Sequence, residues 1–346
     1  MNNSNFVHLH NHSEYSEFDG LAKLDKFVFS ARKMGFRSIA LTDHGNMGGV
    51  LRFRDLCHKK EDKKGKEIKW PIIKPIIGCE MYMSRDRFAR SKKEQPEGAK
   101  GNYHLILLVK NWEGYKNLCY LSQKSYTEGF YMKPRIDFDL LSQHHEGLIC
   151  STACLKSIIN MNLLHDRYDI AKKCVEIFKD IFEDDFFLEV MYHGLAAENS
   201  IMGDIFKLGK ETSTPIIATN DVHYITQEEG NSQEVLMCMS SRTSLTNPKH
   251  LRHSYNEYYL KSADEMSKIF GNHKEVLTNT LAIAERIDDN NIKNGLFSSM
   301  RLPVYNVPDE YDGPQEYLSA LAWDGMKKRG WDKSQPHIDA LEKELH

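Results

Sequence analysis

Three histidines recur at every second position near the start of the chain, in the segment Phe6–Ser13, FVHLHNHS. The segment is predicted to be a β-strand, in which side chains two residues apart point to the same face. His8, His10 and His12 would then share one face. Because imidazole is the commonest protein ligand for zinc-like ions, the spacing indicates half of a metal site. The alternative is three ordinary surface or core histidines.

Other metal-binding side chains stand just after predicted strands further along the chain. In parallel α/β barrels the strands all end at one face, so residues scattered in sequence would form one cluster there. His104 stands at the front of its strand and fits this rule less well. The candidates at strand ends are His10 and His12, His44, Glu80, Cys154, and Asp221 with His223.

This mixture of His, Asp, Glu and Cys contains too many ligands for one tetrahedral ion, which takes about three protein ligands when it is catalytic. It favours two or three ions that share bridging carboxylates. Divalent ions about 3.5 to 4 Å apart are typical of sites that cleave phosphoesters. One ion would activate a water, and the others would hold the phosphate and leaving oxygens.

Simpler interpretations of single residues stay open. Asp43 and Asp221 could be helix N-caps or turn formers, Cys154 an inert buried thiol, and Glu80 a surface charge. A hydrolase that uses Cys154 and His223 is conceivable, but it leaves the other histidines and carboxylates without a role. The sequence has no GxSxG motif, no glycine-rich phosphate loop and no GxGxxG motif.

Composition is that of a soluble globular protein: 346 residues, 40% hydrophobic and 27% charged. The net charge of -3 gives no general argument for nucleic-acid binding. The seven cysteines form no CxxC pair, and there is no apolar signal region or run of about 18 apolar residues. We therefore expect a reduced, cytoplasmic setting and no membrane association.

The segments that must position the candidates alternate between strand and helix. Predicted helices cover residues 21–34, 50–56, 112–125 and 170–182. About seven alternations favour an α/β fold with parallel strands, more like a barrel than a sandwich. Besides the opening segment, the predicted strands are residues 38–42, 76–79, 104–109, 148–151, 187–190 and 216–219.

Two polar segments, residues 58–69 and 84–100, interrupt the alternation, and each carries three more basic than acidic residues. They are expected to be loops, either solvated or in contact with a phosphate backbone. After about residue 270 the pattern changes to a helix at 275–287, a turn-rich stretch and a helix at 314–328. We therefore expect a barrel over residues 1–270 and a helical extension over 271–346.

Eight stretches resemble the PHP (polymerase and histidinol phosphatase) domain of bacterial C-family replicative DNA polymerases. The similarity covers most of residues 5 to 270. Other PHP proteins share the HxH and TDH elements, whereas the GFYMKPRID and NDVHY contexts are specific to the polymerases. In chain order the stretches are FVHLHNHSEYSEFDG, ALTDHGNM, PIIGCE, NYHLILLVKNWEGYKNL, EGFYMKPRID, GLICSTACL, ATNDVHYITQEE and RHSYNEYYLKSADEM.

The resemblance implies a distorted seven-stranded (β/α) barrel with a trinuclear metal centre. An intact ligand set implies a metal-dependent 3′-5′ exonuclease, with two or three divalent ions of zinc, manganese or iron as cofactors. Four of the ligands, His10, His12, Asp221 and His223, would also be catalytic. The family's nine ligand positions fall on His10, His12, Asp19, His44, Glu80, His104, Cys154, Asp221 and His223.

Four further residues are predicted to serve the site without binding metal. His8 and Asp43 would contact ligand side chains without binding metal themselves, and His8 would orient one of the ligands. Lys133 and Arg135, in the KPR element, would hold a substrate phosphate.

The acidic triad of the family's palm and its glycine-serine nucleotide-binding motif do not occur in these 346 residues. We therefore expect that this chain alone does not polymerise DNA. It would be either a shortened polymerase or the N-terminal piece of a polymerase that is encoded in parts. Expected partners are a DNA 3′ end, the remaining polymerase chain with palm and fingers, and the sliding clamp or other replisome proteins. Two alternatives are a metal-stabilised module that docks to that chain and a stand-alone phosphoesterase for small substrates.

Overall fold

The computed structural model describes residues 5–17, 19–61, 64–91, 102–247, 250, 256–298 and 305–345. The chain divides into two compact units, Met1–Leu296 and Phe297–His346. Parts of both basic segments, residues 62–63 and 92–100, lie outside the described residues.

A curled sheet of seven strands forms the centre of the first unit. Its order is β1-β2-β3-β5-β6-β7, and β4 pairs with β2. Every strand residue except Lys74 is buried, as expected of a sheet covered on both faces. The strands are β1 (Ser38–Leu41), β2 (Lys74–Met83), β3 (Tyr103–Val109), β4 (Arg135–Ile136), β5 (Leu148–Ser151), β6 (Phe186–Val190) and β7 (Ile216–Ala218).

Strand β3 runs opposite to its neighbours. It pairs antiparallel with both β2 and β5, whereas the other strand pairs are parallel. The expectation of parallel strands throughout was therefore wrong for β3. Because of the reversal, the first residues of β3 lie beside the last residues of β2, and His104 pairs with Tyr82. A ligand at the front of this strand thus reaches the same edge as ligands at the ends of the others.

The opening segment Phe6–Ser13 lies between β1 and the residues that follow β7. None of the described residues 5–17 belongs to a strand, so the predicted strand is not formed. The segment still bonds to both neighbours: Ala40 N donates to the His8 carbonyl (3.0 Å), and His12 N donates to the Val222 carbonyl (2.7 Å). These bonds link the two ends of the strand order, which gives a distorted barrel.

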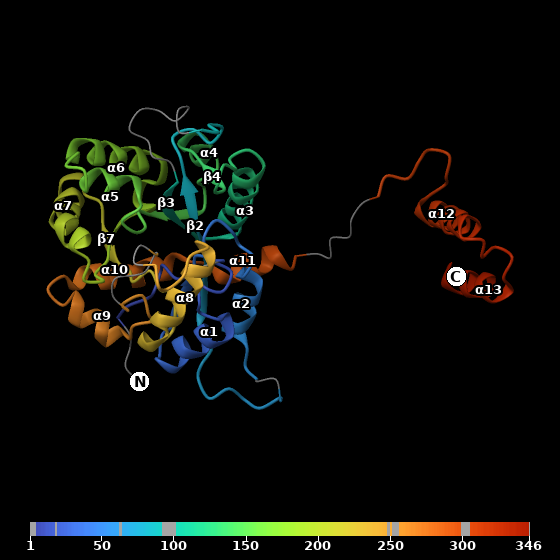
Figure 1. Ribbon diagram of the computed structural model, residues 1–346, viewed down its shortest axis with the longest axis horizontal. Coiled ribbons are helices and arrows are strands. Elements are labelled where there is room, and N and C mark those ends of the chain that lie inside the picture. Colours follow the sequence, from blue (N-terminus) through green and yellow to red (C-terminus); the bar gives the residue numbers. More distant parts are fainter. Residues whose placement is uncertain are drawn as a thin grey trace. The chain divides into compact units, whose positions relative to one another are not determined.

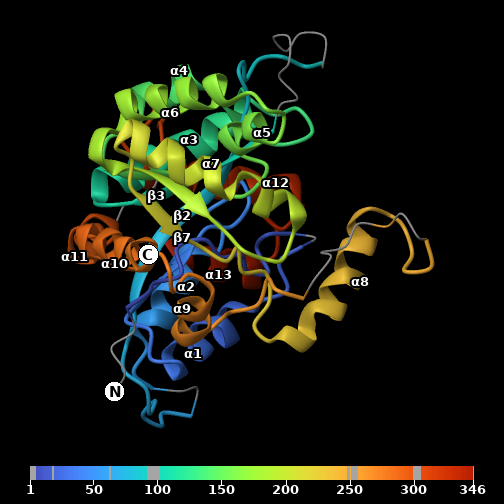
Figure 2. The same cartoon turned by 90° about the vertical axis from the view of Figure 1, so that its left-hand side faces the viewer.

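Helices cover the sheet, with α3 to α7 at one end of the first unit and α1, α2 and α9 at the other (Figures 1 and 2). No helix in the described part of the chain is long and apolar enough to cross a membrane. The helices of this unit are α1 (Leu24–Lys33), α2 (Val50–His58), α3 (Trp112–Thr127), α4 (Phe138–Gln143), α5 (Ile158–Leu163), α6 (Tyr168–Phe182), α7 (Ala196–Thr212), α8 (Gly230–Ser240), α9 (Ala263–Ile269), α10 (Lys274–Arg286) and α11 (Asp289–Leu296), with 3₁₀ turns η1 (Glu183–Asp185) and η2 (Gln227–Glu229).

Helix α1 shows why these segments are helical. Its apolar residues Leu24, Phe27, Val28 and Ala31 recur at steps of three and four, and all are buried. Gly35, at φ +84°, follows the helix and lets the chain turn away.

Helix α10 belongs to the first unit and not to an extension. The Thr280 hydroxyl accepts a hydrogen bond from Val7 N (2.9 Å), and the Asn279 amide donates to the Ile216 carbonyl on β7 (2.8 Å). The helix therefore covers β7 and the opening segment. The first compact unit thus ends at Leu296, whereas the barrel was predicted to end at residue 270, and that boundary stays a prediction.

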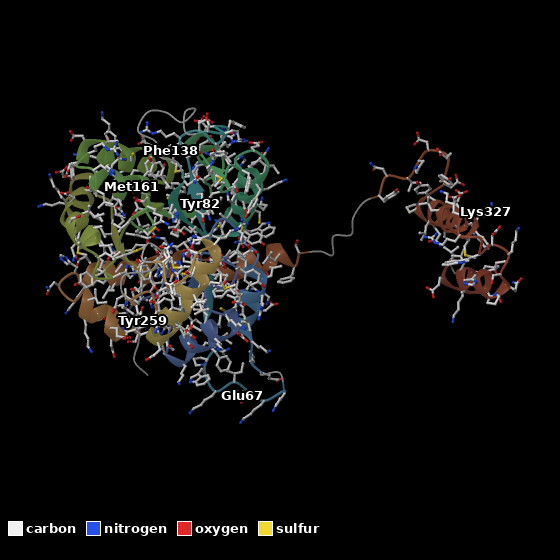
Figure 3. All side chains as sticks on the ribbon, viewed as in Figure 1. Glu67, Tyr82, Phe138, Met161, Tyr259 and Lys327 are labelled. Carbon is white, nitrogen blue, oxygen red and sulfur yellow. The ribbon has the colours of Figure 1, made fainter. Side chains whose placement is uncertain are left out.

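The second unit contains α12 (Pro314–Lys328) and α13 (Gln335–Leu345). The Gln315 side chain donates to the Leu345 carbonyl (3.0 Å), so the start of α12 meets the end of α13. Lys327 marks the last turn of α12 in Figure 3. The helix predicted at residues 314–328 is confirmed.

Candidate metal centre

The nine predicted ligands come together in the first unit. His10, His12 and Glu80 are wholly buried and contact the other members of the group through the bonds described below. The remaining six line a pocket of about 280 Å³; they are Asp19, His44, His104, Cys154, Asp221 and His223.

The first donor group is His10, His12 and Asp221. Each histidine Nε2 lies 3.1 Å from Asp221 Oδ1, and the two Nε2 atoms are 3.2 Å apart. Asp221 has a positive φ of 45°, a left-handed conformation that Asp adopts more readily than most residues. Its Oδ1 is buried and has no hydrogen-bond partner among the described residues, as a metal-ligating oxygen would.

The second donor group is His44, Glu80 and His104. Glu80 Oε1 lies 2.6 Å from His104 Nδ1, and Oε2 contacts His44 Nδ1. The same two oxygens lie 3.5 Å from His10 Nε2 and 3.6 Å from His12 Nε2. Glu80 therefore faces both donor groups, where a bridging carboxylate would lie.

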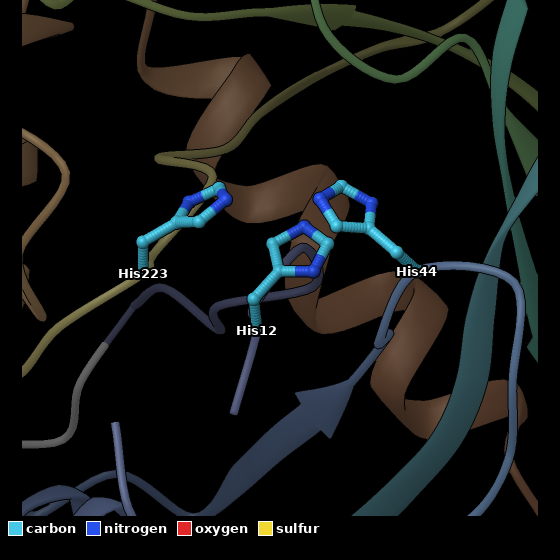
Figure 4. A group of neighbouring side chains, drawn as sticks. All are labelled: His12, His44 and His223. Atoms are coloured by element: carbon cyan, nitrogen blue, oxygen red, sulfur yellow. The ribbon is translucent and has the colours of Figure 1, made fainter. Parts of the chain in front are cut away.

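The third donor group is formed by the rings of His12, His44 and His223, which gather in Figure 4. The His12 centroid lies 4.1 Å from that of His44 and 4.4 Å from that of His223. His12 and His44 each belong to two groups. The three donor groups therefore form one continuous cluster of ligand atoms.

Asp19 and Cys154 stand at the edge of these groups. Asp19 Oδ2 lies 3.1 Å from His44 Nε2, and Cys154 Sγ lies 3.7 Å from His104 Nδ1. Burial, Glu80 and Asp221 raise the pKa of the Cys154 thiol. The thiol therefore stays protonated unless a cation beside it favours the thiolate.

Opposite charges inside the cluster stabilise each other. Burial lowers the pKa of His44, but Glu80 and Asp19 outweigh it and raise that pKa to about 10. Burial raises the pKa of Glu80, but His104 and His44 hold it well below its usual range. Glu80 is therefore ionised, and a bound cation would replace the proton of a neighbouring imidazole.

His12 is held as a neutral imidazole. Burial, together with the charges of His44 and His223, lowers its pKa to about 3. Its Nδ1 donates to Ser16 Oγ (2.9 Å), and Ser16 Oγ donates to Asp43 Oδ1 (2.8 Å). Nε2 is thereby left as the ligating nitrogen. This is the arrangement that the supporting role predicted for Asp43 requires.

Glu189 on β6 orients His10 in the same way, and sequence reasoning missed it. His10 Nδ1 donates to Glu189 Oε2 (3.2 Å). The carboxylate also accepts from the hydroxyls of Thr219 (2.8 Å) and Ser151. A lone carboxylate in the apolar strand FFLEV is the signal that could have identified it, because a buried charge needs such partners.

His8 does not support a ligand as predicted. Its ring Nε2 donates to the Lys261 carbonyl (2.7 Å), and none of the hydrogen bonds that the structure gives this ring reaches the nine ligands. The prediction assumed regular strand alternation, which the opening segment does not adopt. Burial lowers the pKa of His8 to about 4, so the ring is neutral near pH 7.

Arg135 is not available to bind a substrate phosphate. Its guanidinium donates to the backbone carbonyls of Gly129 (3.0 Å), Arg87 (3.1 Å) and Ala89 (2.6 Å), and the residue is 1% exposed. The predicted role is therefore corrected: this arginine fixes a loop.

Two lysines stay in reach of a substrate. Lys133 is exposed, with Nζ 5.0 Å from the ring centroid of Tyr82. Lys156 was not predicted, although it follows Cys154 by two residues; it lines the pocket, and its carbonyl accepts from His104 N (3.1 Å). Among the described residues that line this pocket, Lys156 is the lysine or arginine whose charge could meet a phosphate.

The donor set fits divalent ions. Imidazole and thiolate suit zinc, and carboxylates also admit manganese or iron. Buried Glu80 Oε2 and Asp221 Oδ1 have no hydrogen-bond partner in the described ranges. In each of the three donor groups the ligand atoms lie within 4.8 Å of one another.

Comparison with known proteins decides the family. The PHP domain matches residues 8–193, more than half of the chain. This chain belongs to the PHP domain family. The predicted distorted PHP barrel is confirmed, with β3 reversed.

Relatives named DNA polymerase III subunit alpha match nearly the whole of this PHP chain. The protein of Borreliella burgdorferi is 40% identical over 326 residues, which is 94% of this chain and 27% of that one. That of Treponema pallidum is 38% identical over 331 residues (95% and 27%), and that of Helicobacter pylori 37% over 366 residues (99% and 29%). The chain thus spans less than a third of the length of these relatives.

Two solved structures are weakly similar to this PHP chain, both at 12% identity. One is an amidohydrolase from Chromobacterium violaceum with bound sulfate and no metal, with a TM-score of 0.38 over 63% of this chain and 87% of that one. The other is described as a metal-dependent phosphoesterase from Bifidobacterium adolescentis, with a TM-score of 0.33 over 77% and 95%.

Proposed function

We propose that this PHP domain hydrolyses the terminal phosphodiester of a DNA 3′ end with two or three divalent ions, as a proofreading 3′-5′ exonuclease of a replicative polymerase. The single observation that carries the proposal is the position of Glu80. Its carboxylate faces the imidazoles of both adjacent donor groups. That bridging position suits ions close enough to act on one phosphate.

Each part of the site has a role in this reaction. When bound, divalent ions supply an activated water and neutralise phosphate charge. His10, His12 and Asp221 would hold one ion, and His44, Glu80 and His104 another, with Asp19, Cys154 and His223 completing the centre.

Other side chains of the chain orient the ligands and the substrate. Asp43, through Ser16, and Glu189 fix the ring orientations of His12 and His10, which keeps both Nε2 atoms directed at the cluster. Lys156 lines the pocket, where its ammonium would pair with a phosphate oxygen.

The setting we propose is DNA replication in the cytoplasm. Relatives of this chain are DNA polymerase III alpha subunits three to four times its length. A remaining polymerase chain with palm and fingers, and through it the sliding clamp or other replisome proteins, are therefore the proposed partners. The seven cysteines are free, which fits a reducing compartment.

The test is degradation of a 3′-labelled primer by the full chain with Mn²⁺ or Zn²⁺. We expect shortening by the wild type and a loss of about 100-fold or more in Asp221→Asn and Glu80→Gln, because each removes a ligand charge. Glu176→Gln, an exposed carboxylate on α6, is the matched control and should keep full activity. No shortening with either ion, or undiminished activity in Asp221→Asn, would overturn the proposal.

A second candidate is a metal-stabilised module that docks to the remaining polymerase chain. The complete burial of His10, His12 and Glu80 favours it, because ligands so deep also stabilise the fold. In that case metal removal lowers the melting temperature while the primer stays intact. Hydrolysis of p-nitrophenyl phosphate without attack on DNA would instead indicate a phosphoesterase for small substrates.

A further inference from the structure

An exposed apolar surface lies beside the metal centre, and the reaction proposed above does not use it. It consists of Tyr126, Phe130 and Met132, which are 49, 51 and 76% exposed, with Lys133 next to them. The rings of Tyr126 and Phe130 stack with centroids 6.1 Å apart and planes 20° apart. We call these four residues the aromatic surface. Grouped apolar residues in water mark binding sites.

Tyr82, labelled in Figure 3, connects the aromatic surface to the metal ligands. Lys133 Nζ lies 5.0 Å from the Tyr82 ring centroid. The Tyr82 ring also stacks with the ring of His44, a predicted ligand, at a centroid distance of 6.0 Å. Pro134, the next residue after Lys133, packs against Gly45, the next residue after His44: a Cβ on Gly45 would come within 2.9 Å of Pro134 Cγ. The surface thus adjoins the His44 side of the pocket.

The backbone of the loop after Phe130 is held in place by Arg135. The Arg135 guanidinium ties its loop to the carbonyls of Gly129 and Ala89. A Cβ on Gly129 would lie 1.8 Å from the Arg135 carbonyl oxygen, so the loop can close only over a glycine. A loop held in this way loses little backbone entropy on binding.

Lys133 is the positively charged residue of the aromatic surface. Two nearby carboxylates have partners of their own: Arg87 binds Glu128 (3.1 Å) and Asp137 (2.9 Å), and Lys124 also binds Glu128. Burial raises the pKa of Tyr126, and a third carboxylate, the exposed Glu17, lies close enough to raise that pKa further. The contact that the structure gives Lys133 Nζ is with the Tyr82 ring. Its ammonium therefore still has hydrogens for an anion.

We propose that the aromatic surface binds the single-stranded 3′ segment of DNA whose last phosphodiester enters the pocket. Bases stack on Tyr126 and Phe130, and Lys133 binds a phosphate. Exposed rings beside a cation are how proteins hold single strands without reading sequence. The inference rests on the proposed nuclease function, because the pocket gives the strand its destination.

The test measures binding of a 5′-fluorescein-labelled dT12, with uncleavable phosphorothioate linkages, to the full chain by anisotropy. We expect the Kd of Tyr126→Ala/Phe130→Ala to rise about tenfold or more, since each lost stack weakens binding. Lys133→Gln should flatten the dependence of log K on log salt by about 0.7. Phe29→Ala is the matched control, because Phe29 is a 39% exposed aromatic residue on α1 and should bind DNA as the wild type does.

Melting temperatures equal to that of the wild type exclude misfolding, and Phe130→Trp should keep the affinity because it keeps a stacking ring. An unchanged Kd in the double variant, or no binding of dT12 by the wild type, overturns the aromatic surface as a DNA site. Both results leave the primer-degradation test of the nuclease untouched. Conversely, an inactive wild type that binds dT12 through these residues overturns the nuclease and supports the aromatic surface.

Discussion

Glu80 is the residue on which the proposed metal site depends most. It is 1% exposed, and both oxygens face imidazoles. A buried carboxylate costs free energy unless opposite charges surround it. Groups of histidines and carboxylates this dense are typical of functional sites.

The residues behind the ligands give the first prediction. Glu189→Gln should lower the affinity for Zn²⁺ or Mn²⁺ by about 10- to 100-fold, because outer carboxylates set the orientation and basicity of a ligating imidazole. Competition with a chromophoric chelator measures it. The amide keeps an oxygen for the Thr219 hydroxyl, so folding should persist. An affinity within about twofold of the wild type would contradict the role given to Glu189.

At the scale of elements, the reversed strand β3 explains how a ligand at the front of a strand joins ligands at strand ends. The run HLILLV, which begins at His104, predicts a buried strand correctly. Its direction was not predictable, because a strand buried on both faces has no alternation to orient it. The strand predicted at Phe6–Ser13 is not formed, because an extended segment that closes a barrel has the same sequence pattern as a strand.

Side-chain partners set a second limit on prediction. The nine candidate ligands could be predicted from residue type, spacing and family motifs, and the fold brings their side chains together. The role of Arg135 could not be judged from sequence, because its guanidinium donates to three backbone carbonyls, and two of them, those of Arg87 and Ala89, lie far from it in sequence. Glu189 and Lys156 carry no motif, and only the fold brings them to the site.

Helix α10 gives a second prediction. Thr280→Val should lower the free energy of unfolding by about 1 to 3 kcal/mol, because the buried Val7 N–H loses its acceptor. Thr278→Val, on the exposed side of the same helix, is the control and should change stability much less. Urea unfolding compares the two. Equal stabilities would show that α10 does not support the opening segment.

For the whole molecule, the division after Leu296 gives a third prediction. A chain that ends at Leu296 should fold and bind metal as the full chain does. One that ends at residue 270 should melt about 10 °C lower or more, because it lacks buried apolar residues of α10 such as Val276 and Ile283. Equal melting temperatures for the two shortened chains would instead support a first unit that ends at residue 270.

The most direct test of the central claim is the metal content of the full chain, measured by elemental analysis after purification without added metal and dialysis. The Glu80 carboxylate, which faces the imidazoles of two donor groups, predicts more than one equivalent of divalent zinc, manganese or iron per chain, and clearly less in Glu80→Ala. A stoichiometry near zero in the wild type, which Zn²⁺ or Mn²⁺ added before dialysis does not raise, would contradict a metal centre at this site.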